Sequence, residues 1–279
     1  MTVKANAKVN FTLEVFGKRA DGYHALRSVV MPITLSDTLD IEATDDGLIT
    51  SDTGYDDDLC AKAARILKSS VSSLPSSVGA AIRVTKRIPA GGGLGGGSAD
   101  AAAVLRALNE LWKVGLSREE LAEIGAQVGS DVPALVMGGP VVMEGRGERV
   151  EDLRLKTGDL NLVLVNPGVH SSTKEVYAAC EARPLDGENA TAKMVAALRA
   201  GDVGAIAAAL MNDLQAPAVK QHPEIADALV SLRTAGVIGA MMSGSGSSVF
   251  GLVADELEAR RISSEMNARG YKAWPVHTL

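Results

Sequence analysis

The residue pattern with the clearest chemical meaning is a run of glycines from Gly91 to Gly97, interrupted once by Leu94. Glycine has no side chain to shield its N–H group, and it adopts positive φ without strain, so such a run can wrap its main chain around an anion. A helix predicted to begin at Ser98 would add its free N–H groups and the positive end of its dipole. The pattern therefore predicts a loop that binds a polyphosphate.

Three other glycine-rich motifs agree less well with this run. A Walker A loop requires lysine before its Ser or Thr, whereas residue 97 is glycine. Gly91, Gly93 and Gly96 match a Rossmann fingerprint formally, but a second capped helix follows where that unit requires a strand. A protein-kinase loop requires His-Arg-Asp and Asp-Phe-Gly downstream, and neither tripeptide occurs. A flexible surface loop remains as the alternative to phosphate binding.

Lys8, Asn10 and Asp131 could perform polar chemistry, but each has a structural alternative. Lys8 and Asn10 share one face of an alternating strand, and the pattern alone favours a solvent-exposed face there. Asp131 lies two residues before Pro133 and could be a helix cap. The residue types permit an ion pair, and the spacing does not decide between these interpretations.

Aromatic side chains are candidates for ligand binding because only 3% of the chain is aromatic. Tyr23 and His24 follow an Asp-Gly turn and could be ordinary loop residues, and Tyr177 could be a core residue of its helix. The segment Ser243–Ser248 alternates serine and glycine. It is consistent with a tight turn, or with a second loop that closes over phosphates from the other side.

The elements that must position these residues begin with a strand. Residues 3–15 alternate apolar and polar side chains without error, which predicts one half-buried strand. Further strands are predicted at 24–35, 37–44, 80–88, 140–145 and 161–166. A strand–turn–strand unit at 237–253 and a strand at the C-terminal end complete this set.

Helices are predicted from the 3.6-residue period of apolar side chains. One spans 57–69, one begins at Ser98, and one begins at the capping box Ser117–Glu120. The stretch 171–235 is largely helical, and a last helix spans 255–269. The polar stretch 154–159 suggests a boundary near residue 155 between two domains.

Composition restricts the class of protein. The chain has 279 residues, 46% of them hydrophobic and 22% charged, which is typical of a folded globular protein and not of a disordered one. The formal net charge of -6 provides no positive field for nucleic acid or an anionic membrane surface. We expect neither nucleic acid nor membrane as a partner, and no pattern predicts an oligomeric state.

Cysteine and histidine usage indicates a reducing compartment and no structural metal site. Cys60 and Cys180 form no close pair and are expected to be reduced in a cytoplasmic protein. No metal-binding spacing links the four histidines, which are His24, His170, His222 and His277. The start at Met1 has no apolar signal region, and the uncharged stretch 234–254 is broken by glycine and serine, so no membrane span is expected.

Taken together, these segments resemble the signature regions of the GHMP small-molecule kinases. The similar segments are Ala7–Asn10, Pro89–Ser98, Gly129–Pro133 and Ser243–Gly246. Within that superfamily, further segments resemble the branch that phosphorylates a cytidine-diphosphate-linked methylerythritol: Arg19–His24, Gly92–Ser98, Ser172–Tyr177 and Asn212–Leu214. The match spans residues 4 to about 250 with the motifs in the expected order.

The resemblance implies an α+β, two-domain GHMP kinase fold. Its N-terminal domain would be ribosomal-protein-S5-domain-2-like and bind the nucleotide, over residues 1–155, and its C-terminal domain would be ferredoxin-like, over residues 156–279. The active-site cleft would lie between them. The implied activity is ATP-dependent phosphorylation of the 2-hydroxyl of cytidine diphosphate methylerythritol, a small-molecule acceptor, with Mg²⁺ accompanying ATP through unidentified ligands. Another GHMP kinase, acting on homoserine, mevalonate or a sugar, and a non-catalytic nucleotide sensor are the alternatives.

The resemblance also assigns roles to individual residues. Lys8 and Asp131 would be the catalytic pair. Asn10, Tyr23, His24 and Tyr177 would hold the acceptor, with the two tyrosines on either side of the cytosine and His24 reading its edge. The ATP phosphates would bind the loop formed by Pro89, Ala90, Gly91, Gly92, Gly93, Leu94, Gly95, Gly96, Gly97, Ser98 and Ala99. Two positions depart from the family pattern, since Ala99 replaces a usual serine and Ala134 a common aromatic residue.

Overall fold

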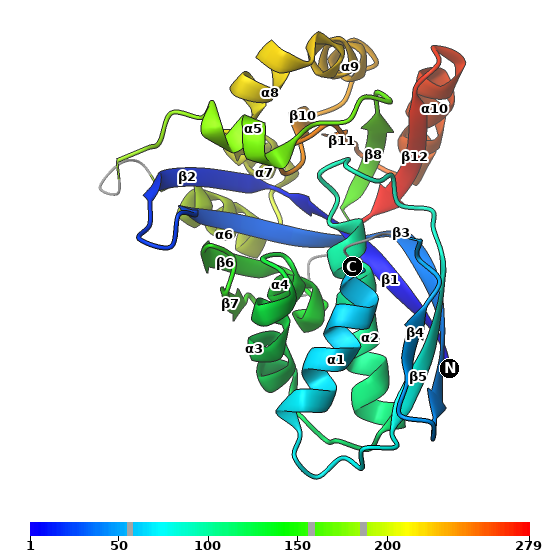
Figure 1. Cartoon of the computed structure of the whole chain (residues 1–279). Helices are drawn as coiled ribbons and strands as arrows, with labels where there is room; N and C mark the ends of the chain where they lie inside the picture. The colour runs from blue at the N-terminus through cyan, green and yellow to red at the C-terminus, as the bar shows by residue number, and fades with distance from the viewer. Residues whose placement is uncertain (55–57, 156–159, 185–188) are drawn as a thin grey trace.

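The computed structural model describes residues 1–54, 58–155, 160–184 and 189–279. Two β-sheets organise these residues, and helices pack against both of them (Figure 1). The predicted α+β class is therefore confirmed. The predicted domain boundary between 155 and 156 falls at the edge of residues 156–159, outside the described residues.

The first sheet is built around one long strand, β3 (His24–Thr44). Antiparallel to it lie β1 (Thr2–Asn10), β2 (Thr12–Lys18), β5 (Gly79–Thr85) and β6 (Val141–Gly145). The sheet is completed by β4 (Ile49–Ser51), β7 (Arg149–Asp152) and β9 (Met211–Asn212). Because β3 pairs with four strands along its length, it links the strand of Lys8 to the strand that leads into the glycine loop.

The predicted single strand over residues 3–15 is wrong in one respect, because it is interrupted at Phe11. The chain forms β1 and β2 instead, and the predicted strands at 24–35 and 37–44 are merged into β3. The register between β1 and β3 shifts between Asn6, opposite Ser36, and Lys8, opposite Pro32. Such a bulge redirects side chains beside it. The alternation in the sequence does not reveal it, because the extra residues belong to the partner strand.

Four helices cover one face of the first sheet (Figure 1). They are α1 (Leu59–Ser70), α2 (Gly96–Leu111), α3 (Arg118–Val128) and α4 (Val132–Met137). The apolar face of α2 is fully buried against β1 and β3. The capping box at Ser117 is formed as predicted. Helix α2 begins two residues before the predicted start at Ser98, because glycines 96 and 97 already take helical geometry.

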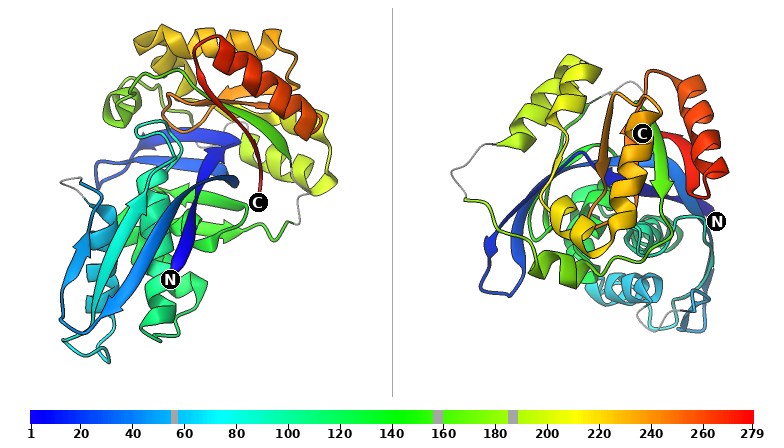
Figure 2. Two further views of the ribbon diagram at one scale, coloured as in Figure 1. Left: turned by 90° about the vertical axis from the view of Figure 1, so that its right-hand side faces the viewer. Right: turned by 90° about the horizontal axis from the view of Figure 1, so that it is seen from above.

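The second sheet has the order β10 (Gly239–Met242), β11 (Val249–Leu252), β8 (Asn161–Asn166) and β12 (Lys272–His277), all antiparallel. Figure 2 shows this sheet and its helices stacked on one end of the first sheet. Its helices are α7 (Val203–Ala209), α9 (Pro223–Thr234) and α10 (Glu256–Ala268), while α8 (Gln215–Gln221) packs on α9, α5 (Thr173–Ala178) on α8, and α6 (Ala190–Ala200) on β2 and β3 of the first sheet. Among the described residues, no helix has the length and apolar character needed to span a membrane.

The two halves of the molecule are joined through β2. Strand β9, from the C-terminal half, pairs with it in parallel, and Asp213 accepts the N–H of Val15 at 2.9 Å. Glu14 is 1% exposed and accepts the N–H groups of Ala190 and Thr191, at the start of α6. These contacts fix the position of the C-terminal half over the strand that begins next to Asn10.

Candidate active site

The glycine loop connects β5 to α2, and its geometry leaves main-chain donors free. Gly95 occupies the N-cap position of α2 with φ +68°, and no side chain caps the helix. The N–H groups in the first turn of an α-helix have no partner within the helix. With no side-chain cap, these groups and the helix dipole are available to an anion, as the sequence predicts.

Glycine is required at two positions of the loop for separate reasons. At Gly93, φ is +74°, and a Cβ atom would clash with the Ser243 carbonyl oxygen. At Gly95, the positive φ is combined with a Cβ position 3.1 Å from Cε of Lys8. A side chain at either residue would displace the loop or its neighbour. The loop therefore lies in direct contact with the residues around it and is not a flexible surface segment.

The second glycine- and serine-rich segment, Ser243–Ser248, supports the glycine loop directly. The hydroxyl of Ser243 donates to the carbonyl of Gly93 at 3.0 Å, and the N–H of Ser248 donates to the carbonyl of Gly92 at 3.1 Å. Asn212 donates to the carbonyls of Met242 and Gly244, both at 2.8 Å. The segment thus links the C-terminal half to the loop, and the pattern of alternating Ser and Gly was a usable signal for it.

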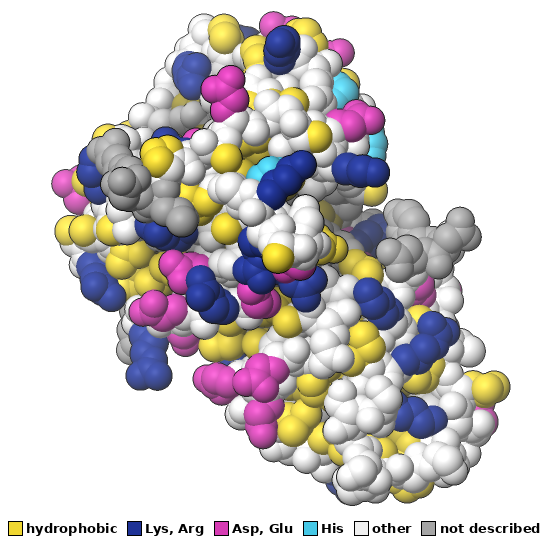
Figure 3. All heavy atoms as spheres, turned by 60° about the vertical axis from the view of Figure 1, so that its left-hand side comes forward, with side chains coloured by type: hydrophobic (Ala, Val, Ile, Leu, Met, Phe, Trp, Pro, Cys, Tyr) yellow, Lys and Arg dark blue, Asp and Glu magenta, His cyan; other side chains and the backbone are white. Residues whose placement is uncertain are grey.

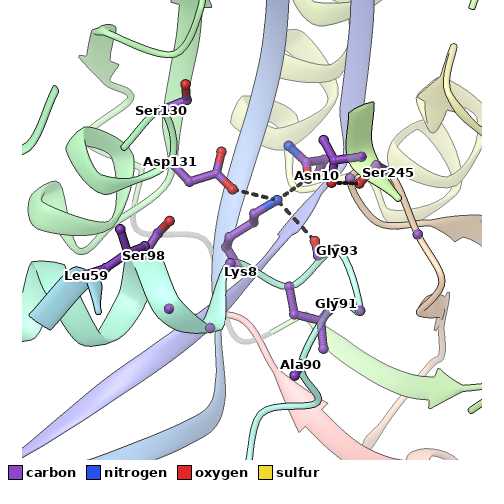
Figure 4. Close-up of a pocket in the computed structure, with 18 of the residues that line it drawn as sticks. Lys8, Asn10, Leu59, Ala90, Gly91, Gly93, Ser98, Ser130, Asp131 and Ser245 are labelled. Atoms are coloured by element: carbon purple, nitrogen blue, oxygen red, sulfur yellow. Dashed lines mark hydrogen bonds and ion pairs between the residues drawn. The ribbon is translucent and has the colours of Figure 1, made fainter. Parts of the chain in front are cut away.

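Lys8 lies at the centre of the site and is almost fully buried. Its ammonium group donates to Oδ1 of Asn10 at 2.7 Å and to the carbonyl of Gly93 at 3.1 Å, and lies 3.3 Å from Oδ2 of Asp131 (Figure 4). Asn10 in turn donates to the hydroxyl of Ser28 at 2.8 Å. The sequence pattern favoured a solvent-exposed face for these residues, and that interpretation is wrong: Lys8 is 3% and Asn10 1% exposed. The loop and the C-terminal half cover that face.

Asp131 does not use its side chain as a helix cap. It occupies the N-cap position of α4, but its carboxylate makes no capping hydrogen bond and points toward Lys8 (Figure 4). Pro133 in the first turn has no N–H to be capped, which leaves the carboxylate free for this ion pair. The side chain of Asp131 is 31% exposed. It therefore faces both Lys8 and the cavity described below.

Three of the predicted acceptor residues are aromatic and line the same cavity, whereas the fourth, Asn10, lies beside Lys8. The rings of His24 and Tyr177 stack with centroids 5.7 Å apart, and Tyr23 is 53% exposed with the Arg146 guanidinium 5.4 Å above its ring. Burial and the positive charge of Lys18 lower the pKa of His24, which favours a neutral imidazole. Burial and the charge of Asp131 raise the pKa of the Tyr177 hydroxyl, so that it stays protonated.

One cavity of about 1050 Å³ connects the loop, the ion pair and these aromatic residues. All of the residues predicted to form the site line it except Ala99, which is buried in the core at 2% exposure. The cavity also contains basic residues that the sequence analysis missed, namely Lys18, Lys86, Arg146 and Lys174. Figure 3 shows basic side chains near the region where the two halves of the molecule meet. Single lysines and arginines carry no spacing signal, so only the fold could reveal them.

Comparisons with known proteins agree with this geometry. The family models for the GHMP kinases N terminal domain and the GHMP kinases C terminal match residues 58–139 and 194–272. The 4-diphosphocytidyl-2-C-methyl-D-erythritol kinase of Pelotomaculum thermopropionicum is 44% identical over 271 residues, which cover 95% of this chain and 93% of the relative. The enzyme of the same name from Symbiobacterium thermophilum is 39% identical over the full length of both chains. This chain belongs to the 4-diphosphocytidyl-2-C-methyl-D-erythritol kinase family of GHMP kinases.

Solved structures share the fold of this chain. A crystal structure of 4-(cytidine 5'-diphospho)-2C-methyl-D-erythritol kinase has a TM-score of 0.83 and 33% identity, and the match covers 100% of this chain and 99% of the other. A homoserine kinase from Cytophaga hutchinsonii has a TM-score of 0.75 at 19% identity, and the match covers 100% of this chain and 94% of the other. At this identity the likeness shows a shared fold alone. The predicted GHMP kinase fold, with its N- and C-terminal family domains, is confirmed.

Proposed function

We propose that this protein transfers the terminal phosphoryl group of ATP to the 2-hydroxyl of 4-diphosphocytidyl-2-C-methyl-D-erythritol, in non-mevalonate isoprenoid precursor synthesis. The observation that carries the proposal is the Lys8–Asp131 ion pair, 3.3 Å long, in a cavity that the glycine loop also lines. Membership of the kinase family supports the identity of the acceptor. The free cysteines Cys60 and Cys180 support a reducing, cytoplasmic location.

The loop from Pro89 to Ser98 would hold the phosphates of ATP. Its free N–H groups and the N-terminal end of α2 provide donors and a positive potential without any lysine inside the loop. Ala99 would contribute through packing, because its side chain is buried beneath the first turn. The terminal phosphate would then lie toward Lys8, whose ammonium group contacts the carbonyl of Gly93.

Asp131 would accept the proton of the acceptor hydroxyl, and Lys8 would hold Asp131 in place. Phosphoryl transfer passes through a loose transition state, so alignment and charge stabilisation matter more than the strength of the base. A carboxylate suffices because the proton can leave late, as the new bond to phosphorus forms. The positive charge of Lys8 would also offset the charge on the transferring group. The bond from Lys8 to Asn10 fixes the direction of the ammonium group.

Tyr23 and Tyr177 would bind the cytosine ring between them, with His24 at its edge and Asn10 near the polyol. Stacking of a base on an aromatic ring contributes ~1–3 kcal/mol in single-stranded nucleic acids, which is the closest general measure. In the structure the ring of His24 lies against Tyr177, so the base would have to take the place of His24 on that face. The neutral imidazole then offers both a donor and an acceptor to a base.

Mg²⁺ would accompany ATP and neutralise part of the phosphate charge. Among the described residues, no group of three or more His, Cys, Asp or Glu side chains is arranged to hold a metal ion. Mg²⁺ is commonly held by one carboxylate together with phosphate oxygens and water, and Asp131 is the carboxylate beside Lys8 at the loop. The single carboxylate of Asp131 is therefore compatible with a Mg²⁺ ion that enters the site bound to ATP.

The decisive test measures ADP release with ATP, Mg²⁺ and a panel of acceptors. We expect turnover with 4-diphosphocytidyl-2-C-methyl-D-erythritol and none with homoserine, mevalonate or galactose. Phosphorylation of one of the other acceptors would assign a different GHMP kinase activity. ATP binding without turnover on any acceptor would indicate a nucleotide sensor and would overturn the proposal.

A further inference from the structure

A cluster of three charged residues, two of them buried, lies beneath the glycine loop, and the phosphoryl-transfer mechanism does not use it. The Lys86 ammonium lies 2.5 Å from Oδ2 of Asp37 and 2.6 Å from Oδ2 of Asp100. Asp37 comes from β3 and Asp100 from α2, and their residues are 0% and 2% exposed. Lys86 directly follows β5. Two buried carboxylates therefore share one ammonium group, whose side chain is 29% exposed and lines the cavity.

The hydrogen bonds of the cluster indicate a missing proton. Oδ1 of Asp37 accepts the N–H groups of Arg87 and Ile88. Oδ2 of Asp37 has the Lys86 ammonium beside it, whereas Oδ1 of Asp100 is buried and has no hydrogen-bond partner among the described residues. Buried polar atoms without partners are rare and unfavourable. A proton on the Asp100 carboxyl would avoid a bare buried carboxylate oxygen at this position.

The charges support the same conclusion. With both carboxyls ionised, one ammonium group leaves an excess negative charge on two carboxyls that are themselves buried, which is unfavourable. Burial, with a smaller contribution from the charge and hydrogen bond of Asp37, raises the pKa of Asp100 to about 7 against the lowering effect of Lys86. Two carboxyls that share a site cannot both ionise readily.

Within the part of the chain that the structure describes, no further charged group in contact compensates this excess. On α1, the Cys60 thiol faces the cluster, and burial together with Asp100 and Asp58 raises its pKa, so the thiol remains neutral. Asp58 caps α1 through the N–H groups of Cys60 and Ala61 and adds negative charge. From the strand side the cluster is approached by the N–H groups of Arg87 and Ile88, which are uncharged donors.

The cluster lies where the triphosphate of ATP would bind. Lys86 and Asp100 both line the cavity, and the Lys86 ammonium lies 3.6 Å from the position that a Cβ atom on Gly96 would take. Gly96 is the first residue of α2, whose N–H groups we assign to phosphate binding. A negative charge at this place would oppose the phosphates, whereas a neutral cluster would not.

We propose that Asp37 and Asp100 share one proton, and that this proton keeps the cluster around Lys86 neutral so that the glycine loop can hold ATP. The proposal rests on the proposed function, since it places the triphosphate at the loop. Asp37, Lys86 and Asp100 are positioning residues: they do not touch the reacting atoms. Loss of the shared proton as pH rises through neutrality adds one negative charge beneath the phosphates, and ATP binding weakens.

The test measures the dissociation constant of ATP from pH 6 to pH 8.5 for the wild type, Asp100→Asn and Asp40→Asn. Asparagine at 100 can donate to Asp37 at every pH, so this variant should keep tight binding over the whole range. In the wild type, the ATP dissociation constant should rise about three- to tenfold more between pH 6 and pH 8.5 than it does in Asp100→Asn. Asp40 is exposed on β3, and its variant should follow the wild-type curve.

A second measurement needs no variant of the cluster. Infrared spectra of the wild-type protein should contain a carboxylic-acid carbonyl band at pH 6 that disappears as pH rises toward 8.5. Parallel binding curves for the wild type and Asp100→Asn, or the absence of this band, would overturn the shared proton. Failure to bind ATP at any pH would instead contradict the proposed function.

Discussion

At the scale of single residues, the site depends on how one ammonium group is surrounded. Lys8 has partners in β1, in the glycine loop and at the start of α4, namely Asn10, Gly93 and Asp131. A lysine that is 3% exposed needs such partners, because an unpaired buried charge is strongly unfavourable. The same contacts hold Asp131 away from helix capping and toward the cavity. The two residues that we propose as the catalytic pair are therefore already in contact without a ligand.

We predict that Asp131→Asn lowers turnover by about 10²–10⁴ while ATP binds with nearly unchanged affinity, because the change removes a proton acceptor and keeps the shape of the side chain. Steady-state kinetics with the assigned acceptor and equilibrium dialysis with ATP would measure the two quantities separately. Asp40→Asn, an exposed change on β3, is the control and should leave both unchanged. Turnover of Asp131→Asn close to that of the wild type would remove Asp131 from the mechanism.

At the scale of elements, the glycine loop is shaped by its neighbours as much as by its own sequence. Ser243 and Ser248 hold the carbonyls of Gly93 and Gly92. Helix α4 is fixed at its other end, where Arg106 donates to the carbonyl of Leu135 at 2.6 Å. The loop and the start of α4 are thus brought to Lys8 from opposite sides, each by contacts outside the site.

We predict that Gly95→Val weakens ATP binding at least about tenfold, because a β-branched residue tolerates positive φ poorly and its Cβ would lie 3.1 Å from Cε of Lys8. The measurement is the ATP dissociation constant, with circular dichroism to check folding. Gly139→Val is the matched control: no atom lies within 4 Å of its Cβ position and its φ is not positive. Equal ATP affinity in Gly95→Val and the wild type would show that the loop does not need its observed backbone.

At the scale of the whole molecule, the cavity exists because two sheets are joined side by side. Asp213, next to β9, accepts from Val15 in β2 at 2.9 Å and from Nε of Arg183 at 2.8 Å. Strand β2 continues toward the turn that carries Tyr23 and His24. Strand β2 therefore connects the junction between the two halves to the part of the cavity that we assign to the acceptor.

We predict that Asp213→Ala lowers the free energy of unfolding by about 2–3 kcal/mol, since it leaves a partly buried guanidinium and a backbone N–H without their acceptor. It should raise the KM for the acceptor more than the KM for ATP, because β2 leads to the acceptor end and not to the glycine loop. Urea unfolding and steady-state kinetics would test this. Glu256→Ala breaks an exposed ion pair with Arg260 and should change stability by less than about 1 kcal/mol. If Asp213→Ala also changed the free energy of unfolding by less than about 1 kcal/mol, Asp213 would not be important for joining the two halves of the molecule.

Features that depend on local chemistry could be predicted from the amino-acid sequence. The glycine run predicts its own backbone, because few other residues take positive φ, and the capping box at Ser117 predicts the start of α3. The ordered motifs were sufficient to predict the family and the loop, ion-pair and aromatic residues that line the cavity, but not its basic residues. Local pattern is enough where one residue or one turn sets the geometry.

Which polar residues are buried together depends on the tertiary structure. Alternation placed Lys8 and Asn10 on a face that looked solvent-exposed, but the glycine loop and the C-terminal half cover that face. The sequence also has no spacing signal that links Asp37, Lys86 and Asp100, which are separated by up to 63 positions. The packing of β3, β5 and α2 nevertheless brings both carboxylates within 2.6 Å of the Lys86 ammonium group. Burial and charge coupling arise from contacts between distant segments, and a linear pattern contains no record of them.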